Sequence, residues 1–300
     1  MPPLDATDLR HRYVSANGVR LHVVEAGPED GVPVILLHGF PEMWYGWKHQ
    51  IPAMADAGYR VIAPDQRGYN RSGKPASVAA YDLDLLAGDV VSLADDAIAR
   101  SPADGVHVVG HDWGAVVAWH LASTASDRLK SLSILNVPHP SVFIDTLTSD
   151  LDQLSRSWYI FFFQIPWLPE ALLRRNDFAG LRKMLRASGH RNTFTAADEE
   201  RYVESWRTPG ALSGMINWYR AAARRGLRQR PDRSSIPAPT QVIWGEQDVA
   251  LKASMAQPSV DLCRDGRLEM IPEATHWVQH DAPDRVNRLL LEHFERTAGG

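Results

Sequence analysis

Asp112 lies in a stretch of the sequence that predicts a strand, a tight turn and a helix in succession. The valine-rich run 106–109 ends at Gly110, and Gly114 follows Asp112 by two residues before an Ala/Val-rich stretch begins. This pattern is typical of a strand–turn–helix elbow, which holds its central side chain, most often a serine, on a strained turn above the ends of parallel strands. A carboxylate in that place is ionised near neutral pH and can displace a leaving group at a saturated carbon. The sequence therefore predicts an ester between Asp112 and a substrate.

Hydrolysis of such an ester requires a general base. A histidine and an acid that come later in the chain can together act as this base. Asp248 follows the predicted strand 240–245, and His276 follows the predicted strand 268–271. We expect Asp248 to orient His276, which then activates a water molecule to attack the carbonyl carbon of the ester. Glu246, two residues before Asp248, is the alternative orienting acid.

Backbone amides near the elbow are expected to stabilise the oxyanion of that second step. Phe40 follows the turn His38-Gly39, and Trp113 follows Asp112 directly. The N–H groups of Phe40 and Trp113 form the predicted oxyanion hole, because main-chain donors fixed beside a reacting carbonyl bind its developing charge.

The leaving group decides which reaction such a site performs. A halide leaves as a stable anion and needs only hydrogen-bond donors, whereas an epoxide oxygen leaves as an alkoxide and needs a proton. Tyr159 and Tyr219 are predicted to supply this proton, because a phenol with an ordinary pKa near ~10 stays protonated at rest and can protonate an alkoxide. Both tyrosines lie in a segment that is expected to cover Asp112.

The elements that must position these residues alternate between strands and helices. Residues 13–16 and 19–24 predict an antiparallel hairpin at a sheet edge, because Asn17-Gly18 between them tolerates positive φ. The further predicted elements are strands at 32–37, 59–65, 106–109, 129–137, 240–245 and 268–271 and helices at 83–99 and 283–295. Such alternation indicates an α/β fold with a mostly parallel central sheet, whose working loops lie at the carboxyl ends of the strands.

The composition of the chain changes between residues 141 and 231. This segment is rich in Trp, Tyr, Phe, Leu and Arg at helical spacings and lacks a β-branched run long enough for a core strand. We therefore predict three parts: a first core part at 1–140, an inserted helical cap (lid) domain at 141–231 and a second core part at 232–300. Most of the aromatic stretch 158–167 is expected to line the pocket and to fill the core of the cap.

Length, charge and cysteine content exclude several classes of protein. The 300 residues are 44% hydrophobic and carry a formal net charge of -4, with acids and bases mixed along the chain, so no basic face for nucleic acid is predicted. The one cysteine, Cys263, rules out an internal disulfide, and no metal site or cofactor is expected. Because the sequence shows neither an apolar run near the ~20 residues of a membrane span nor a secretory signal, we expect a cytoplasmic monomer or homodimer that acts on small molecules.

Several motifs together resemble those of one family, the epoxide hydrolases of the α/β-hydrolase superfamily, over nearly the full length of the chain. Residues 38–41 (His-Gly-Phe-Pro) resemble the family's oxyanion turn, and residues 110–114 (Gly-His-Asp-Trp-Gly) resemble its aspartate elbow. Residues 65–72 resemble the family's loop after the following strand. The resemblance implies that Asp112, with His276, carries the reaction of that family.

The resemblance extends to the two tyrosines. Tyr159, five residues before Gln164, and Tyr219, within Asn-Trp-Tyr-Arg, stand where the family has its ring-opening tyrosines. The resemblance implies trans addition of water to an epoxide, which gives a vicinal diol. In one place the sequence departs from the family, which often has Gly before the catalytic histidine. This chain has Thr275 there, a change that removes no functional group.

Two other hypotheses stay open at the level of sequence. The Asp-Trp elbow is shared with dehalogenases of haloalkanes or haloacids, which use the same aspartate nucleophile and release a halide. A catalytically silent hydrolase fold that serves as a ligand receptor is the alternative outside the enzymes. Such receptors have lost members of the triad, and this sequence has lost none.

Overall fold

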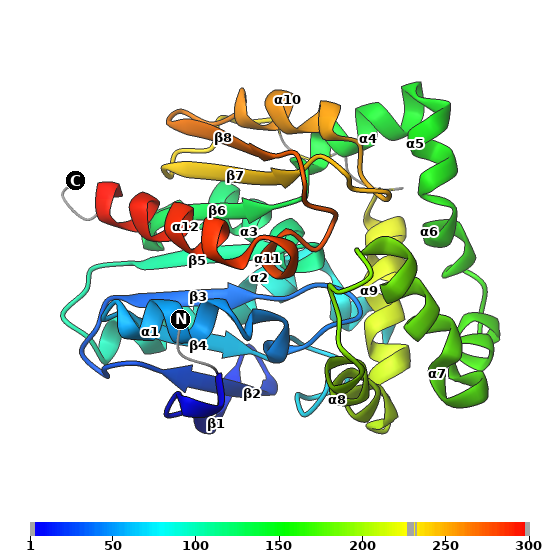
Figure 1. The fold of residues 1–300 in the computed structure, drawn as a ribbon, viewed down its shortest axis with the longest axis horizontal. Coiled ribbons are helices and arrows are strands. Elements are labelled where there is room, and N and C mark those ends of the chain that lie inside the picture. The colour runs from blue at the N-terminus through cyan, green and yellow to red at the C-terminus, as the bar shows by residue number, and fades with distance from the viewer. Residues whose placement is uncertain (1–3, 227–230, 232, 298–300) are drawn as a thin grey trace.

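An eight-stranded sheet forms the centre of the computed structural model, which describes residues 4–226, 231 and 233–297 of the chain (Figure 1). The strands are β1 (Arg10–Ala16), β2 (Val19–Ala26), β3 (Pro33–Leu37), β4 (Arg60–Pro64), β5 (Val106–His111), β6 (Leu129–Leu135), β7 (Thr240–Gly245) and β8 (Gly266–Ile271). They lie in the order β1-β2-β4-β3-β5-β6-β7-β8. Neighbours from β4 to β8 pair in parallel, whereas β2 pairs antiparallel with both β1 and β4. The α/β fold and the mostly parallel sheet predicted from the sequence are confirmed.

Helices cover both faces of this sheet. In the described residues the α-helices are α1 (Gln50–Asp56), α2 (Leu83–Ala99), α3 (Trp113–Thr124), α4 (Pro140–Ser149), α5 (Leu151–Arg156), α6 (Trp158–Phe162), α7 (Leu168–Ser188), α8 (Ala196–Arg207), α9 (Ala211–Gly226), α10 (Ala256–Val260), α11 (Val278–Asp281) and α12 (Pro283–Thr297). Helices α1 and α12 pack together on one face of the sheet, and α2 and α3 pack together on the other (Figure 1). Across the part of the chain that the structure describes, none of these helices combines the length and the apolar composition that a bilayer crossing demands.

The predicted hairpin forms the edge of the sheet. Strands β1 and β2 pair from Ala16 with Val19 outward, and Asn17 and Gly18 between them have φ of 44° and 77°. Two successive positive φ values define the turn whose twist matches that of the flanking strands. The Asn-Gly pair therefore sets both the turn and the register of the edge.

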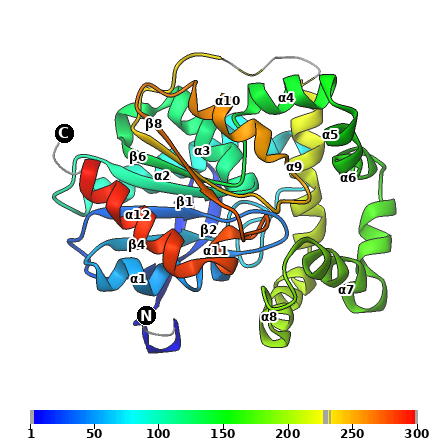
Figure 2. The same ribbon diagram turned by 45° about the horizontal axis from the view of Figure 1, so that its top comes forward.

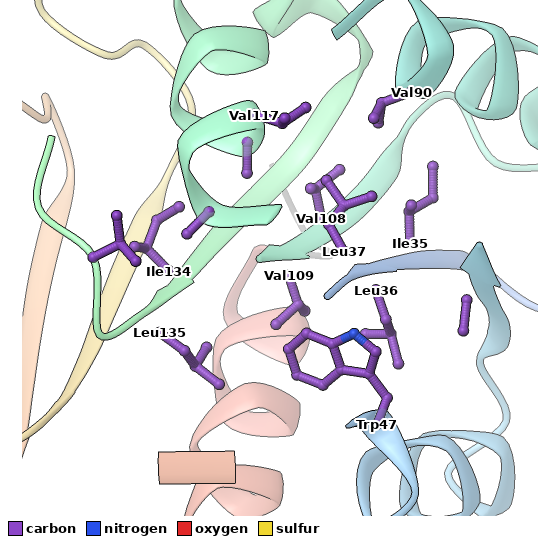
Figure 3. Close-up of a cluster of buried hydrophobic side chains, with 14 of the residues drawn as sticks. Ile35, Leu36, Leu37, Trp47, Val90, Val108, Val109, Val117, Ile134 and Leu135 are labelled. Atoms are coloured by element: carbon purple, nitrogen blue, oxygen red, sulfur yellow. The ribbon is translucent and has the colours of Figure 1, made fainter. Parts of the chain in front are cut away.

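The middle of the sheet is apolar on both faces, which holds the ends of the parallel strands rigid. Every residue of β3 is buried, and alternate side chains of β3 and β5 point to opposite faces. Figure 3 shows Leu36 and Val109 on the side of Trp47, and Val108 on the side of Val90. Burying one such aliphatic side chain contributes roughly 1.5–3 kcal/mol to folding. The loops that follow these strands thus start from fixed points.

Helices α4 to α9 form one helical segment, residues 140–226, between β6 and β7. This helical segment lies beyond the carboxyl ends of the parallel strands (Figures 1 and 2). Helix α7 is interrupted at residues 175–178, where three successive residues have positive φ. The division of the chain at 140 and 231 into core, cap and core stays a prediction, and the second boundary adjoins residues 227–230 and 232, outside the described residues.

Candidate active site

Asp112 occupies the sharp turn between β5 and α3. Its φ of 48° and ψ of -122° lie in a region that residues with a side chain rarely adopt. Three glycines make room for this turn, because a Cβ at Gly39 would overlap the Asp112 side chain and one at Gly114 would overlap the Leu37 carbonyl. A Cβ at Gly110 would lie 2.6 Å from the Gly114 carbonyl oxygen. The spacing of glycines in the sequence is therefore explained by close backbone packing around the elbow.

His276 lies between two carboxylates, Asp248 and Asp112. Its Nδ1 is 2.7 Å from Asp248 Oδ2, and its Nε2 is 3.8 Å from Asp112 Oδ2. The Asp248 side chain is fully buried, whereas that of Asp112 is 19% exposed. Glu246, the alternative acid, is exposed to solvent. The loops after β7 and β8 thus bring Asp248 and His276 to the elbow, and the alternative pairing with Glu246 is not seen.

The main-chain N–H of Phe40 points at the elbow carboxylate. It donates a hydrogen bond to Asp112 Oδ1 with an N–O distance of 2.6 Å. Phe40 comes from the loop that follows β3, the neighbour of β5 in the sheet. Trp113 begins α3 directly after Asp112, and the role of its N–H group stays a prediction. One oxygen of Asp112 is therefore fixed by a backbone donor, while the other faces His276.

The charges around His276 control its protonation. Burial by itself lowers the pKa of this imidazole, but the carboxylates of Asp248 and Asp112 outweigh burial and raise the pKa to about 10. For Asp248, burial raises the pKa, but His276, together with hydrogen bonds from the Leu251 N–H and the Asn136 side chain, outweighs burial, so the pKa of this carboxyl is lowered. His276 is therefore an imidazolium at neutral pH while Asp112 carries its charge.

The two predicted tyrosines come from different helices and meet over the elbow. Tyr159 lies in α6 and Tyr219 in α9, with their ring centroids 5.9 Å apart. The Tyr219 ring also lies 5.0 Å from that of Trp113, in an edge-on arrangement. Burial, followed by the negative charge of Asp112, raises the pKa of both phenols above the ordinary value. Both hydroxyl groups thus remain protonated at neutral pH.

The aromatic stretch 158–167 splits into two faces. Phe163 is buried and lies 4.8 Å from the Tyr219 ring, so this part of the stretch lines the site as predicted. The prediction is wrong for Trp158, Phe161 and Trp167, which are 61%, 55% and 74% exposed. Because side chains three and four residues apart share one side of a helix, turning Phe163 inward together with residue 159 turns residues 158 and 161 outward.

Asn136 is a site residue that the sequence analysis missed. It follows β6 with a φ of 52°, and its Nδ2 donates to Asp248 Oδ2 at 2.9 Å. Its Oδ1 accepts a hydrogen bond from the N–H of Gly245. A signal was present, because Asn136 stands at the carboxyl end of a predicted parallel strand, where polar residues of the site gather.

A second missed feature is a buried network behind the histidine. The Nε2 of His111 donates to the main-chain oxygen of His276 at 2.9 Å. Glu42, fully buried, accepts hydrogen bonds from the Tyr202 hydroxyl at 2.6 Å and from His280 Nε2 at 2.8 Å. Burial raises the pKa of Glu42, but His280 and His111 outweigh it, so the pKa is lowered and the carboxylate stays charged. Through the ring of His111, these buried residues contact the main chain at His276.

The sheet, the elbow and the loops around it define a hydrolase of the α/β-hydrolase fold, and comparisons with known proteins agree. The family model described as "alpha/beta hydrolase fold" matches residues 32–283. The AB hydrolase superfamily protein YfhM of Bacillus subtilis (strain 168) is 45% identical over 95% of this chain and 97% of its own length. Epoxide hydrolase 2 of Caenorhabditis elegans is 36% identical over 95% of this chain and 79% of its own.

Solved structures lead to the same family. The crystal structure of the Bacillus megaterium epoxide hydrolase with an inhibitor is similar with a TM-score of 0.86 and 29% identity, covering 95% of this chain and 100% of that one. The chain belongs to the epoxide hydrolases of the α/β-hydrolase superfamily. The resemblance noted in the sequence is confirmed.

Proposed function

We propose that this chain hydrolyses epoxides to vicinal diols through a covalent ester on Asp112. The observation that carries the proposal is the position of His276, bound to Asp248 at 2.7 Å and facing Asp112 Oδ2 at 3.8 Å. A nucleophilic carboxylate and a general base this close together support the formation of an ester, followed by its hydrolysis. The relatives named as epoxide hydrolases support an epoxide as the substrate class.

In the first half-reaction, Asp112 Oδ2 attacks one carbon of the epoxide. We assign Oδ2 as the attacking atom because Oδ1 is already held by the Phe40 N–H. As the new bond forms, the carbon–oxygen bond of the ring breaks, and the oxygen takes a proton from Tyr159 or Tyr219. Their raised pKa values keep both phenols protonated until the more basic alkoxide develops. The product of this step is a hydroxyalkyl ester of Asp112.

Formation of the ester prepares His276 for the second half-reaction. Although burial opposes it, the charges of Asp248 and Asp112 together hold the histidine pKa at about 10. Esterification removes the charge of Asp112, so the pKa of His276 falls and the histidine can release its proton, which restores the tyrosine that protonated the ring oxygen. The neutral ring then takes a proton from a water molecule that attacks Cγ of the ester. The N–H groups of Phe40 and Trp113 bind the oxyanion on Oδ1. As the acyl–oxygen bond breaks, the departing alkoxide takes the proton that His276 removed from water, and the diol is released.

The helical segment acts as a cap in this proposal. It supplies Tyr159 and Tyr219, whereas Asp112, Asp248 and His276 come from loops of the sheet. Closure of helices over the elbow limits the entry of water, which supports the first half-reaction over direct solvent attack. The route uses a small-molecule epoxide and no cofactor. The cytoplasmic location and the monomeric or dimeric state stay predictions.

An isotope experiment tests the proposal. In a single turnover with excess enzyme in water enriched in oxygen-18, we expect the label to enter the Asp112 carboxylate and the diol to leave unlabelled. The reason is that the solvent oxygen attacks Cγ, while the diol keeps Oδ2 of Asp112. Mass spectrometry of the diol and of the peptide containing Asp112 reads both positions.

Multiple turnovers provide the internal control for this experiment. The label in the carboxylate then passes into the diol of later cycles, so the labelled fraction rises after the first turnover. Solvent oxygen in the diol of the first turnover, with unlabelled Asp112, would reject the ester.

The tyrosines distinguish this proposal from a dehalogenase. We expect Tyr159→Phe and Tyr219→Phe each to lower kcat for an epoxide about 10- to 100-fold, and the double variant to lower it about 10³- to 10⁴-fold, because the alkoxide then lacks a proton donor. Diol formation from styrene oxide, followed by chromatography, measures this loss. Tyr13→Phe is the matched control, since Tyr13 lies on the edge strand and is 46% exposed. Halide release from haloalkanes that is unaffected in the double variant, without diol formation, would favour a dehalogenase. The receptor hypothesis fails if the unmodified protein turns over any of these substrates.

A further inference from the structure

The loop that carries His276 contacts one short part of the helical segment, residues 188–195, which comprises the last residue of α7 and the connection to α8. We call residues 188–195 the bridging segment. Ser188 Oγ accepts a hydrogen bond from Trp277 Nε1 at 2.9 Å, and the Phe194 ring lies 5.1 Å from the Trp277 ring. His190 Nε2 donates to the main-chain oxygen of Glu273 at 2.7 Å. The helical segment therefore contacts the histidine loop on both sides of His276.

Asp281 makes the most direct connection between the bridging segment and the histidine loop. Its Oδ1 accepts a hydrogen bond from the Thr193 hydroxyl at 2.5 Å. Its Oδ2 accepts two hydrogen bonds from Thr275, one from the main-chain N–H at 2.8 Å and one from the hydroxyl. One carboxylate thus joins a residue of the helical segment to the residue that immediately precedes His276.

The surroundings leave this connection little freedom. Thr193 is 7% exposed and Thr275 is 5% exposed, so both hydroxyl groups depend on protein partners. A Cβ at Gly189 would lie 2.9 Å from Thr193 Oγ1, which shows how closely the bridging segment folds on itself. Hydrogen bonds to a charged carboxylate are the stronger kind, and here one carboxylate receives three. A shift of the bridging segment is therefore transmitted to the main chain at Thr275.

We propose that Asp281 is a positioning residue that couples the bridging segment of the cap to the orientation of His276, and thereby controls hydrolysis of the ester. The inference rests on the proposed function and deepens it. The family often has glycine at the position of Thr275. In this proposal the threonine helps to hold the histidine loop, because its hydroxyl is one of the three donors to Asp281.

The proposal predicts that the two half-reactions respond differently. Attack by Asp112 on the epoxide uses its own charge and the tyrosines, so it is insensitive to small shifts of the histidine ring. Hydrolysis of the ester needs His276 Nε2 within hydrogen-bond reach of the attacking water, and a displacement of about 1 Å can cost about 100-fold in rate. Loss of Asp281 therefore slows the second half-reaction selectively.

The test follows both half-reactions by rapid mixing with styrene oxide, acid quenching and intact-protein mass spectrometry. In Asp281→Ala we expect ester formation within about twofold of the unmodified protein and ester hydrolysis about 10- to 100-fold slower, so that the adduct accumulates during turnover. Thr193→Val keeps both hydrogen bonds from Thr275 to Asp281 and removes only the hydrogen bond from the Thr193 hydroxyl to Asp281. In Thr193→Val we expect ester hydrolysis to be slowed selectively, but less than in Asp281→Ala. Combining the two substitutions should slow ester hydrolysis no more than Asp281→Ala does alone. Asp104→Ala, at an exposed acid paired with Lys130, is the matched control.

The outcomes separate this inference from the proposed function. His276→Gln serves as the reference, since it must accumulate the adduct if the ester pathway operates. If it does so while Asp281→Ala and Thr193→Val hydrolyse the ester at the unmodified rate, the coupling is refuted and the ester pathway stands. Equal slowing of both half-reactions in Thr193→Val would also refute it, because this points to a general structural role. Absence of the adduct in His276→Gln would refute the ester pathway itself.

Discussion

Replacing His276 with glutamine is expected to stop the reaction halfway and to leave the substrate bound covalently to Asp112. Glutamine cannot accept a proton from water at neutral pH, so the ester forms and its hydrolysis loses general-base assistance, about 10²- to 10⁴-fold in rate. The protein should gain the mass of one epoxide, so that about one equivalent of epoxide is consumed and almost no diol is released on the time scale of normal turnover. Intact-protein mass spectrometry, followed by peptide mapping, locates the added mass.

A second histidine provides the control for this experiment. His120 lies on α3 and bonds Asp84 at 2.7 Å, away from the elbow, so His120→Gln should turn over normally without an adduct. An adduct on a residue other than Asp112 would contradict the assignment of the nucleophile. Unchanged turnover by His276→Gln would contradict the assignment of the base.

The fold and the central residues of the site could be predicted because their signals are local. The strand at 240–245, the helix at 83–99 and the turn Asn17-Gly18 follow from short runs of sequence, and the structure has them as predicted. Asp112, Asp248 and His276 all follow predicted strands, and parallel strands bring their carboxyl ends to one edge. Knowledge of the sheet was therefore enough to predict that these three side chains would meet.

The connections that support the site could not be predicted in the same way. Asp281 becomes a partner of Thr193 only because the turn between α7 and α8 reaches the histidine loop, 88 residues away in sequence. Glu42 and Tyr202 meet across 160 residues. No periodicity in either segment specifies such a contact, because it depends on how the helical segment lies over the sheet. The sequence shows which residues can react and leaves open what holds them in position.

The aromatic stretch shows the same limit. Hydrophobic residues at 158, 161, 163 and 167 suggested burial, but a helix that packs on one side can bury only part of them. Phe163 faces the site, whereas Trp158 and Trp167 face solvent. Composition indicated an aromatic segment near the site, and the orientation of each ring had to come from the structure.

The Asp112→Asn variant should lose diol formation completely, because an amide is too weak a nucleophile to open an epoxide. We expect kcat to fall about 10⁴- to 10⁶-fold, in the range found when a member of a catalytic triad is removed. Neither label nor mass should appear on residue 112. Intact-protein mass must exclude reversion of the amide to the carboxylate, and Asp104→Asn, an exposed acid, is the matched control. Normal activity in a verified amide would overturn the proposed function.

The same variant tests the electrostatic argument independently of turnover. With Asp112 neutral, burial still lowers the pKa of His276 and only Asp248 still raises it, so the pKa should fall below about 10. Nuclear magnetic resonance of the ring nitrogens measures this change directly. In the unmodified protein, preferential protonation of folded His276 stabilises the fold fully below the ordinary pKa of about 6.5, and this stabilisation is lost as the pH rises toward about 10. In Asp112→Asn the loss should be complete at a lower pH, which urea unfolding at several pH values can measure. A histidine pKa that stays at about 10 would show that Asp112 does not hold the proton on His276, and ester formation could then not release it.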